Sequence, residues 1–380
     1  MKDRMYCMDL TFNSSRPNTL GVEIELQIIN PETKELASGS PQILEKAQGD
    51  PHIKQELFQS VIEINTDVCE NIDQVRDELN LRVGILQKHA SDCGFELAGA
   101  STHPFSSWKD QQPFPDPRYQ KLLDDIQYLA RRMLTFGLHV HVGVNSPEKA
   151  IYINNSMISY LPVLFALTTS GPYWTGSYSG LASLRPKIFE TLPNAGMPSY
   201  LHCWHEYRRI MMLLHKAESI KTIREIWWDV RPHPNFGTIE VRTCDVLPTI
   251  DETVALTALI QCIAARLSDL YDANEEMILL PYMIVKENRW RAIRRGIEAE
   301  LIDMTGNKIP VRAYVEDLLD KLSETASKLN CSHELEGIQK ILKNGTSSQR
   351  QRLVYQKTNS FPKVVESLVE ELKHNTLCLA

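Results

Sequence analysis

The stretch Gly137-Leu-His-Val-His-Val-Gly143 alternates two imidazoles with aliphatic side chains. In a β-strand, residues two apart lie on the same face of the sheet. His139 and His141 therefore point in one direction, and the aliphatic residues between them point to the opposite face, where they would pack a core. This alternation predicts a strand in a sheet with one polar face and one buried face.

Two other stretches repeat the pattern with charged groups. Glu23 and Glu25 alternate with aliphatic residues in Gly-Val-Glu-Ile-Glu-Leu, and Glu240 and Arg242 do so in Gly-Thr-Ile-Glu-Val-Arg. Glu63 adds a carboxylate within the apolar run Val-Ile-Glu-Ile-Asn. Carboxylates on a buried face need cations, because without them they would repel one another or become protonated. Hard oxygen ligands favour Mg²⁺ or Mn²⁺, so the sequence predicts a cation site suited to a phosphorylated substrate.

Each pattern also has a plain structural interpretation. The first two glutamates could lie on an exposed edge strand, and the histidines could be satisfied core residues. Glu240 and Arg242 could form an ordinary ion pair. The planar fork of arginine is nevertheless the natural partner of a transferring phosphoryl group, and the imidazoles could ligate a metal or donate to phosphate oxygens.

The composition is that of a soluble globular protein. The chain has 380 residues, of which 43% are hydrophobic and 23% charged. Its formal net charge of −7 argues against general nucleic-acid binding. It has no run of about 18 apolar residues and no apolar leader near Met1, which predicts neither a transmembrane helix nor a secretory signal. Eight cysteines without a Cys-x-x-Cys pair predict reduced thiols, no cysteine zinc site and a cytoplasmic protein.

Strand-like runs come early and helix-like runs late, which is typical of an α+β fold. The strand-like runs are 19–29, 61–65, 95–100, 137–144, 225–230 and 237–244. The expected helices are 71–93, 116–132, 147–169, 199–216, 251–270, 281–302, 311–329, 334–343 and 361–372. Residues 175–199 are expected to form a long loop of the kind that often covers a functional site.

We expect a single catalytic domain over residues 1–380, with a sheet-and-helix core at 18–280 and a helical C-terminal layer at 281–380. The chain contains neither Gly-x-Gly-x-x-Gly nor Gly-x-x-x-x-Gly-Lys-Ser/Thr. A nucleotide site of the Rossmann or P-loop kind is therefore not indicated.

Together these motifs resemble the bacterial carboxylate–amine ligase family, whose members are usually called type 2 glutamate–cysteine ligases. The resemblance rests on Gly21-Val-Glu-Ile-Glu25, on the His139 motif and on the run 227–245, with further matching blocks at 61–66, 102–105, 287–292 and 345–351. It covers about residues 18–357. Members often carry Glu-Glu-Glu or Glu-Glu-Phe where this chain has Glu23-Ile-Glu-Leu26, but both same-face carboxylates are kept.

The resemblance implies a glutamine-synthetase-like fold, in which a curved antiparallel sheet of about six strands forms a funnel with helices outside. It implies ATP, two or more Mg²⁺ or Mn²⁺ ions, and an amino-acid carboxylate activated as an acyl phosphate. The implied metal ligands are Glu23, Glu25, Glu63, His139 and Glu240, although His139 could contact a phosphate instead. The implied catalytic residues are Arg242, on the transferred phosphoryl group, and His141, on a phosphate. The matching blocks also supply candidate nucleotide or substrate contacts, namely His103, Arg231, Arg291 and Arg350.

We therefore expect an ATP-dependent ligase that joins glutamate or a similar carboxylate to cysteine or another amine. The resemblance and the frequency of twofold assemblies predict a homodimer, and no nucleic acid or membrane is expected as a partner. Side chains of the 175–199 loop are expected to select the substrates.

Two alternatives belong to other classes. A metal-dependent hydrolase or oxygenase could be built on His139, His141 and a carboxylate, a ligand set that favours Zn²⁺ or Fe²⁺. A ligand-binding or scaffold protein without activity is the third class, and the intact set of glutamates, histidines and arginine argues against it.

Overall fold

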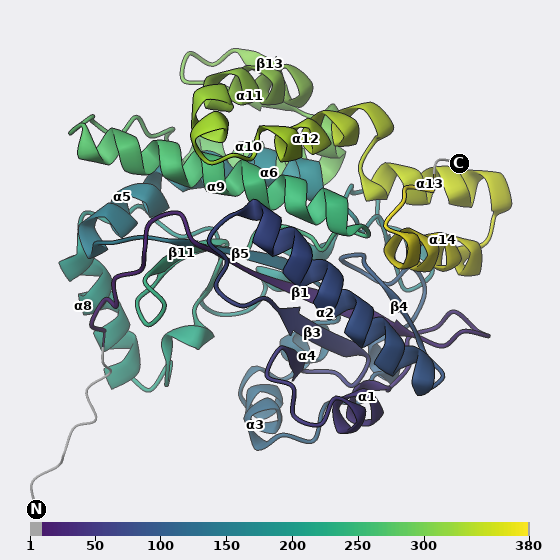
Figure 1. Ribbon diagram of the computed structural model, residues 1–380. Coiled ribbons are helices and arrows are strands. Elements are labelled where there is room, and N and C mark those ends of the chain that lie inside the picture. The colour runs from purple at the N-terminus through teal and green to yellow at the C-terminus, as the bar shows by residue number, and fades with distance from the viewer. Residues whose placement is uncertain (1–9, 379–380) are drawn as a thin grey trace, which may run out of the picture.

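A seven-stranded antiparallel sheet forms the centre of the molecule (Figure 1). The computed structural model describes residues 10–378. The strand order is β10-β11-β5-β1-β3-β2, and β4 pairs with the end of β1. The strands are β1 (Leu20–Ile29), β2 (Ile53–Gln55), β3 (Val61–Asn65), β4 (Glu96–Ala98), β5 (Leu138–Gly143), β10 (Val230–His233) and β11 (Thr238–Val241). An antiparallel sheet with outer helices was expected, and β2 is the strand that the sequence analysis missed.

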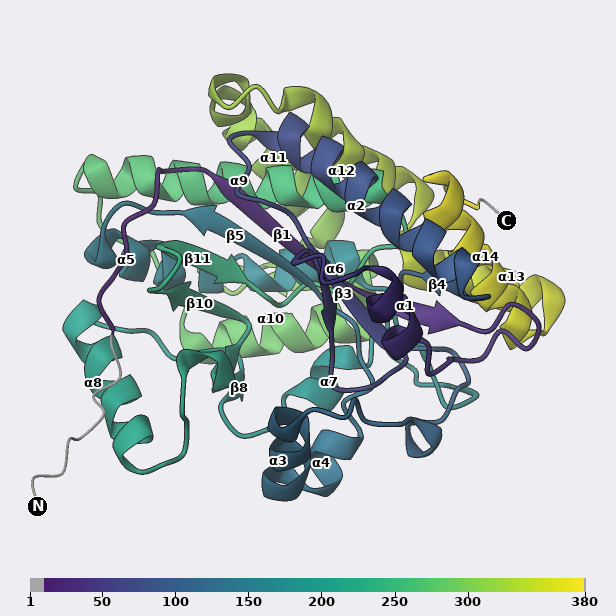
Figure 2. The same ribbon diagram turned by 60° about the horizontal axis from the view of Figure 1, so that its bottom comes forward.

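Helices lie on both sides of this sheet (Figure 2). They are α1 (Ser40–Lys46), α2 (Ile72–Asp92), α3 (Pro117–Ile126), α4 (Tyr128–Arg131), α5 (Pro147–Ile158), α6 (Leu161–Thr168), α7 (Arg185–Phe189), α8 (Trp204–Lys216), α9 (Ile250–Asp272), α10 (Tyr282–Arg295), α11 (Val311–Lys328), α12 (Ser332–Asn344), α13 (Ser347–Thr358) and α14 (Phe361–His374). Short strand pairs complete the fold: β6 (Tyr173–Trp174) with β7 (Ser177–Tyr178), β8 (Ala195–Gly196) with β9 (Trp227–Trp228), and β12 (Glu300–Ile302) with β13 (Lys308–Pro310).

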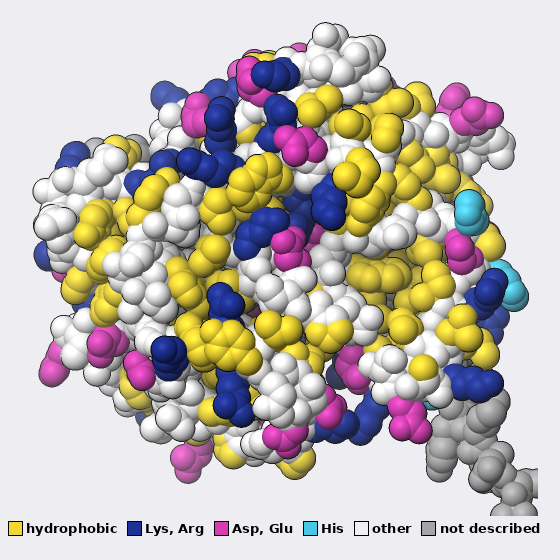
Figure 3. Space-filling model, turned by 180° about the vertical axis from the view of Figure 1, so that it is seen from behind, with side chains coloured by type: hydrophobic (Ala, Val, Ile, Leu, Met, Phe, Trp, Pro, Cys, Tyr) yellow, Lys and Arg dark blue, Asp and Glu magenta, His cyan; other side chains and the backbone are white. Residues whose placement is uncertain are grey.

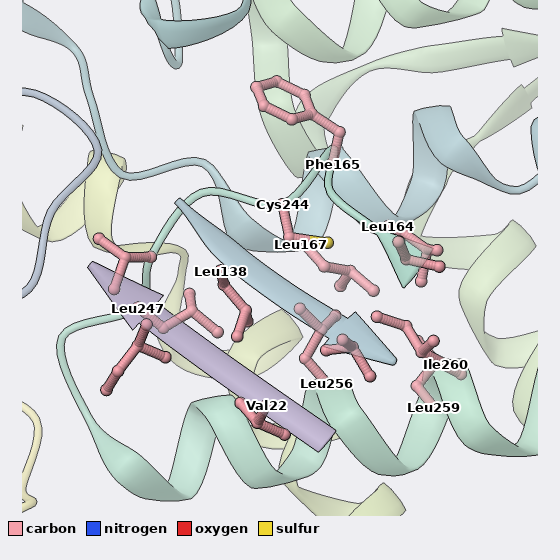
Figure 4. Close-up of a cluster of buried hydrophobic side chains, with 14 of the residues drawn as sticks. Val22, Leu138, Leu164, Phe165, Leu167, Cys244, Leu247, Leu256, Leu259 and Ile260 are labelled. Atoms are coloured by element: carbon pink, nitrogen blue, oxygen red, sulfur yellow. The ribbon is translucent and has the colours of Figure 1, made fainter. Parts of the chain in front are cut away.

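The apolar face of the sheet packs against α9 and α2. Figure 4 shows Val22 of β1 and Leu138 of β5 beside Leu256 and Leu259 of α9, and all four side chains are fully buried. Burying an aliphatic side chain contributes about 1.5–3 kcal/mol, so this layer holds the strands in register with their polar side chains on the other face. α9 has the length and apolarity to cross a membrane, but 78% of its most apolar 18-residue window is buried inside the fold, as in a core helix.

Two expected helices are each divided in two. The run 147–169 forms α5 and α6, which are bent by 61° relative to each other, because Pro162 in the first turn of α6 cannot continue the hydrogen bonding of α5. The run 116–132 is broken at Gln127, whose φ of +56° lies in the left-handed region.

The C-terminal third is less purely helical than expected. α10 ends at Arg295, and residues 300–302, expected to end this helix, form β12, which pairs with β13 in a hairpin. In its turn, the Asp303 carboxylate accepts hydrogen bonds from the N–H groups of Thr305 and Asn307, a turn chemistry that competes with helix. The strand expected at 225–230 is displaced into β9 and β10, and α13 was not expected. The 175–199 loop contains the short elements β7, α7 and β8.

The cysteines within residues 10–378 are all free thiols. Cys7 lies outside the described residues.

Candidate active site

Seven of the expected site residues share one face of the central sheet. The strand register arranges them in four cross-strand pairs, Glu23–His139, Glu25–Glu63, His141–Glu240 and Arg231–Glu240. Residues directly opposite on antiparallel strands have Cβ atoms about 4.5–5.5 Å apart. The motifs therefore converge as predicted, because β1, β3, β5 and β11 are neighbours in the sheet.

The first group of these side chains, the histidine cluster, consists of Glu23, His141 and Glu240. One ligand atom from each lies within 4.8 Å of the others. The Nε2 atom of His141 is 3.7 Å from Glu23 Oε1 and 3.9 Å from Glu240 Oε1. The other ring nitrogen, Nδ1, is 2.9 Å from the hydroxyl oxygen of Thr238. A Nδ1–H donated to Thr238 leaves the Nε2 lone pair directed at the carboxylates, as is usual for a metal-binding imidazole.

The second group, the carboxylate cluster, consists of Glu25, Glu56 and Glu63, with ligand oxygens again within 4.8 Å of one another. Burial, together with the charge of Glu25, raises the pKa of Glu56 to about 7. Burial and the charges of Glu23, Glu56 and Glu25 raise the pKa of Glu63 well above its usual value. Lys54 Nζ lies 3.6 Å from Glu63 Oε1 at the rim. Lys54 and the charge of Arg118 leave the pKa of Glu56 and Glu63 raised, so the cluster fits a hard divalent cation.

Two arginines flank Glu240, which is almost completely buried. Arg231 binds it with Nε 2.7 Å and Nη2 3.3 Å from the two carboxylate oxygens, and also donates to the carbonyl of Ile223. Arg242 contacts the same carboxylate through Nη1. Although burial favours the neutral acid, the two arginines hold the pKa of Glu240 well below its usual value.

Arg242 retains binding capacity of its own. Its Nε is buried and has no hydrogen-bond partner among residues 10–378. Burial opposes its charge, but Glu240 outweighs this effect and raises its pKa. A charged guanidinium with an unused donor beside the histidine cluster is suited to an anionic group there.

The two histidines have different surroundings. His141 belongs to the histidine cluster, whereas His139 has Nδ1 3.1 Å from Glu23 Oε2. This bond and the charges of the two imidazoles overcome the effect of burial and lower the pKa of Glu23 to about 2. Burial and the charge of Arg242 lower the pKa of His139. Glu23 contacts both histidines, but Glu240 and the carboxylate cluster make the ligand set rich in carboxylates, which favours hard cations over the hydrolase or oxygenase alternative.

Gly137 lies between Glu25 of the carboxylate cluster and Arg185 of the 175–199 loop. Its N–H donates to Glu25 Oε2 over 2.6 Å. Arg185, at the start of α7, packs so closely that a Cβ on Gly137 would overlap its guanidinium. Arg185 donates in turn to the carbonyls of Arg242 and Thr243, each over 3.2 Å. A glycine is needed here because the guanidinium lies where a side chain would be.

Three expected nucleotide or substrate contacts have other partners. His103 is fully buried, with Nδ1 accepting from the N–H of Ser106 and Nε2 3.0 Å from the carbonyl of Lys34. Arg291 contacts Glu287 and the carbonyl of Glu300.

Arg350 is the third, and it lies in a buried ion network. Its Nε is 2.9 Å from Glu371, and its Nη1 is 3.0 Å from Glu252. His103, Arg291 and Arg350 thus use their polar atoms in internal contacts, and we leave them out of the proposed site. Arg231 remains in it as a partner of Glu240.

Glu56 is the residue that the sequence analysis missed. It follows β2, outside any regular strand, so no two-residue alternation connects it with Glu63. The available signal was weak: a charged residue close before the apolar strand that carries Glu63.

The sheet, the helices outside it and the two clusters with Arg242 fit the glutamine-synthetase-like carboxylate–amine ligase that the sequence predicts. The chain belongs to glutamate–cysteine ligase family 2, whose family model matches residues 19–371. This confirms the resemblance and the class of enzyme.

Curated relatives match over nearly their full length. A Gloeobacter violaceus protein named "Putative glutamate--cysteine ligase 2" is 41% identical over 95% of this chain and 98% of its own. A Thermobifida fusca protein of the same name is 39% identical over 96% of this chain and 94% of its own.

Solved structures support the fold. A Francisella tularensis glutamate–cysteine ligase in complex with AMP has a TM-score of 0.63 at 14% identity, covering 96% of this chain and 90% of its own. A bifunctional glutathione synthetase from Pasteurella multocida has a TM-score of 0.66 at 14% identity. That match covers 94% of this chain, which spans about half (52%) of the longer enzyme.

Proposed function

We propose that this enzyme uses ATP to activate the carboxylate of glutamate or a similar amino acid as an acyl phosphate, which cysteine or another amine then attacks. The observation that carries the proposal is the pair of clusters on one sheet face with Arg242 beside them. Direct condensation of a carboxylate with an amine in water is unfavourable, so the carboxylate needs a good leaving group. The γ-phosphoryl group of ATP supplies it when donor and acceptor oxygens are held in line.

We assign Mg²⁺ or Mn²⁺ to the two clusters. Glu23, His141 and Glu240 would hold one ion, and Glu25, Glu56 and Glu63 another. Bound there, divalent ions neutralise charge on the phosphates of ATP. The raised pKa of Glu56 and of Glu63 supports this assignment. Burial and the repulsion between neighbouring carboxylates raise both pKa values, and a bound cation would relieve that repulsion.

The protein side chains then have separate tasks. Arg231 holds Glu240 in place, and Arg242 stabilises the phosphoryl group in transit with its unused donor. His139 orients Glu23 through their hydrogen bond. The attacking amine expels phosphate from the acyl phosphate, so no covalent link to the enzyme is required.

A cavity of about 510 Å³ supports the expected role of the 175–199 loop in substrate selection. Residues from this loop and from α10 line it, including Lys187, Met197, Arg289 and Trp290. α10 lies behind α9 in Figure 1, and the rear view shows basic and acidic side chains among hydrophobic ones near its centre (Figure 3). Such a mixed lining suits a zwitterionic amino acid.

Asp229 connects the cavity to the catalytic face, because it contacts both Arg289 and Arg242. Arg289 contacts Glu190 over 2.6 Å and Asp229 over 2.9 Å. The carbonyl of Asp229 accepts the N–H of Arg242 over 2.8 Å. An amino acid held beside Arg289 would therefore lie near the strand end that carries Arg242.

The function is tested by measuring ADP and phosphate release from ATP with Mg²⁺ over pairs of amino acids, with detection of the amide product. We expect turnover that needs both amino acids and stops with a chelator. No amide product with any pair, or full activity in excess chelator, would contradict the proposal.

We further propose that the whole chain acts as one catalytic unit, as a cytoplasmic homodimer. A monomeric mass in light scattering at micromolar concentration would contradict the dimer.

A further inference from the structure

Phe236 presents a large aromatic ring at the tip of the β10–β11 hairpin. Its exposed fraction is 52%, unusual for a phenylalanine beside a buried polar site. One face of the ring stacks on His233, with ring centroids 4.2 Å apart and an angle of 9° between the planes. His233 is itself buried, so the phenylalanine ring has a firm support on that side.

The hairpin tip is held in place by the N-terminal segment. The Ser15 hydroxyl donates to the carbonyl of Phe236 over 2.6 Å, and the N–H of Asn13 donates to the carbonyl of Pro234 over 2.8 Å. Gly237 has a φ of +61°, and a Cβ there would overlap the carbonyl oxygen of Asn13. The position of the exposed ring is therefore fixed by the backbone.

The Phe236 ring contacts the ring of His141, which is a member of the histidine cluster. The His141 ring is 5.7 Å from the Phe236 ring and 5.7 Å from the His233 ring, edge-on to both. The same His141 directs Nε2 at Glu23 and Glu240. Glu240 and Thr238 are successive same-face residues of β11, and Thr238 is the first residue of this strand, next to the hairpin tip at 234–237. A molecule bound at the cluster would thus extend toward Phe236.

We propose that Phe236 is the stacking platform for the purine base of the nucleotide whose phosphates lie at the histidine cluster. This inference rests on the proposed use of ATP. Aromatic side chains bind bases by stacking, because every base offers a π-face. Stacking on one face does not read the hydrogen-bonding edge of the base, so Phe236 contributes affinity without strongly separating adenine from guanine.

The test compares a ligand with a base and a ligand without one. Equilibrium binding of Mg²⁺–ADP and of Mg²⁺–tripolyphosphate is measured by calorimetry on wild type, Phe236→Leu and Phe236→Trp. Phe236→Leu keeps an apolar side chain but loses the aromatic face, and it should weaken ADP binding by about 5- to 150-fold, the range observed for base stacking. Tripolyphosphate binding should not change, and Phe236→Trp should bind ADP at least as well as wild type.

A matched control is Leu213→Ala on α8, where the exposed leucine (55%) is equally apolar. It should leave ADP binding unchanged. ADP binding by Phe236→Leu at wild-type strength, or an equal loss for tripolyphosphate, would overturn the inference. Stacking-dependent ADP binding without ligase turnover would reject the proposed function and keep the platform, whereas a wild type that binds no nucleotide would overturn both.

Discussion

Glu25 and Glu63 lie directly opposite each other on β1 and β3, with Glu56 as a third carboxylate beside them. Like charges directly opposite on neighbouring strands are destabilising. The arrangement therefore lowers the stability of the metal-free protein, and the cation that we propose for this cluster would relieve the repulsion.

Glu56→Gln should stabilise the metal-free protein and reduce its stabilisation by Mg²⁺, because it removes a ligand from one of the two proposed cation sites. The pKa of Glu56 is raised to about 7 in the folded state, so stability is lost as the pH rises from the usual carboxyl range through 7. Removing this charge should raise the free energy of unfolding at pH 8 by on the order of 1 kcal/mol, after allowance for solvent screening. Denaturant unfolding with and without Mg²⁺ measures both effects.

Glu32→Gln, at an exposed glutamate, is the control for charge removal. It should alter neither the stability nor the response to Mg²⁺. A destabilised Glu56→Gln protein that still responds fully to Mg²⁺ would show that this carboxylate is structural.

Arg242→Lys should lower kcat by roughly 100-fold or more, with a much smaller change in the KM for ATP. Lysine keeps the charge but loses the planar fork that suits a phosphoryl group. Arg231→Lys is the matched variant, because Arg231 binds the same Glu240 but uses its other donors on backbone carbonyls. It should chiefly lower the melting temperature. Near-normal kcat in a destabilised Arg242→Lys protein would remove Arg242 from the chemistry.

His103 should make stability fall in mild acid. Burial lowers the pKa of His103 to about 3 in the folded protein, whereas the unfolded chain protonates it near 6.5. The unfolded state thus binds the extra proton first, and stability is lost as the pH falls from about 6.5 toward 3. Between pH 7 and pH 5 this group accounts for about 2 kcal/mol.

Unfolding free energies of wild type and His103→Gln at the two pH values test this. The variant is expected to be less stable at pH 7 but to lose less stability on acidification. His333→Gln, at an exposed histidine, should keep the wild-type slope. Equal slopes for all three proteins would argue that His103 is not held neutral by burial.

Arg350→Met should destabilise the protein by about 3–5 kcal/mol, because it leaves Glu252 and Glu371 buried without their cation. Arg352→Met, two residues away on α13, removes a partly exposed arginine and should cost far less. Thermal unfolding gives both values, and ADP binding by the folded Arg350→Met protein should be normal. Selective loss of ADP binding with normal stability would return Arg350 to the nucleotide site.

The strands of the site were predictable because each carries its own two-residue alternation. Glu23, Glu25, His139, His141 and Glu240 were placed on one face on this basis, and the structure brings them together. Which histidine lies opposite which glutamate was not predictable, because it depends on which strand pairs with which and at what register.

Other features lacked a periodic signal. β2 has three residues, two of them the polar Lys54 and Gln55, and Glu56 follows it in irregular backbone. Residues 300–302 were wrongly expected to end a helix, because their pairing with β13 depends on a turn that the side chain of Asp303 stabilises. His103 and Arg350 were candidates only by motif, and their burial among internal partners comes from tertiary packing.

The polar face of β1 also determines how far apart the two clusters stand. Glu23 and Glu25 are successive same-face residues of one strand, so about 6.8 Å of extended backbone separates them. This spacing comes from the covalent geometry of a single strand and is independent of the surrounding loops. Insertions and substitutions in those loops can therefore change which molecules reach the face while the distance between its two charge-binding positions stays constant.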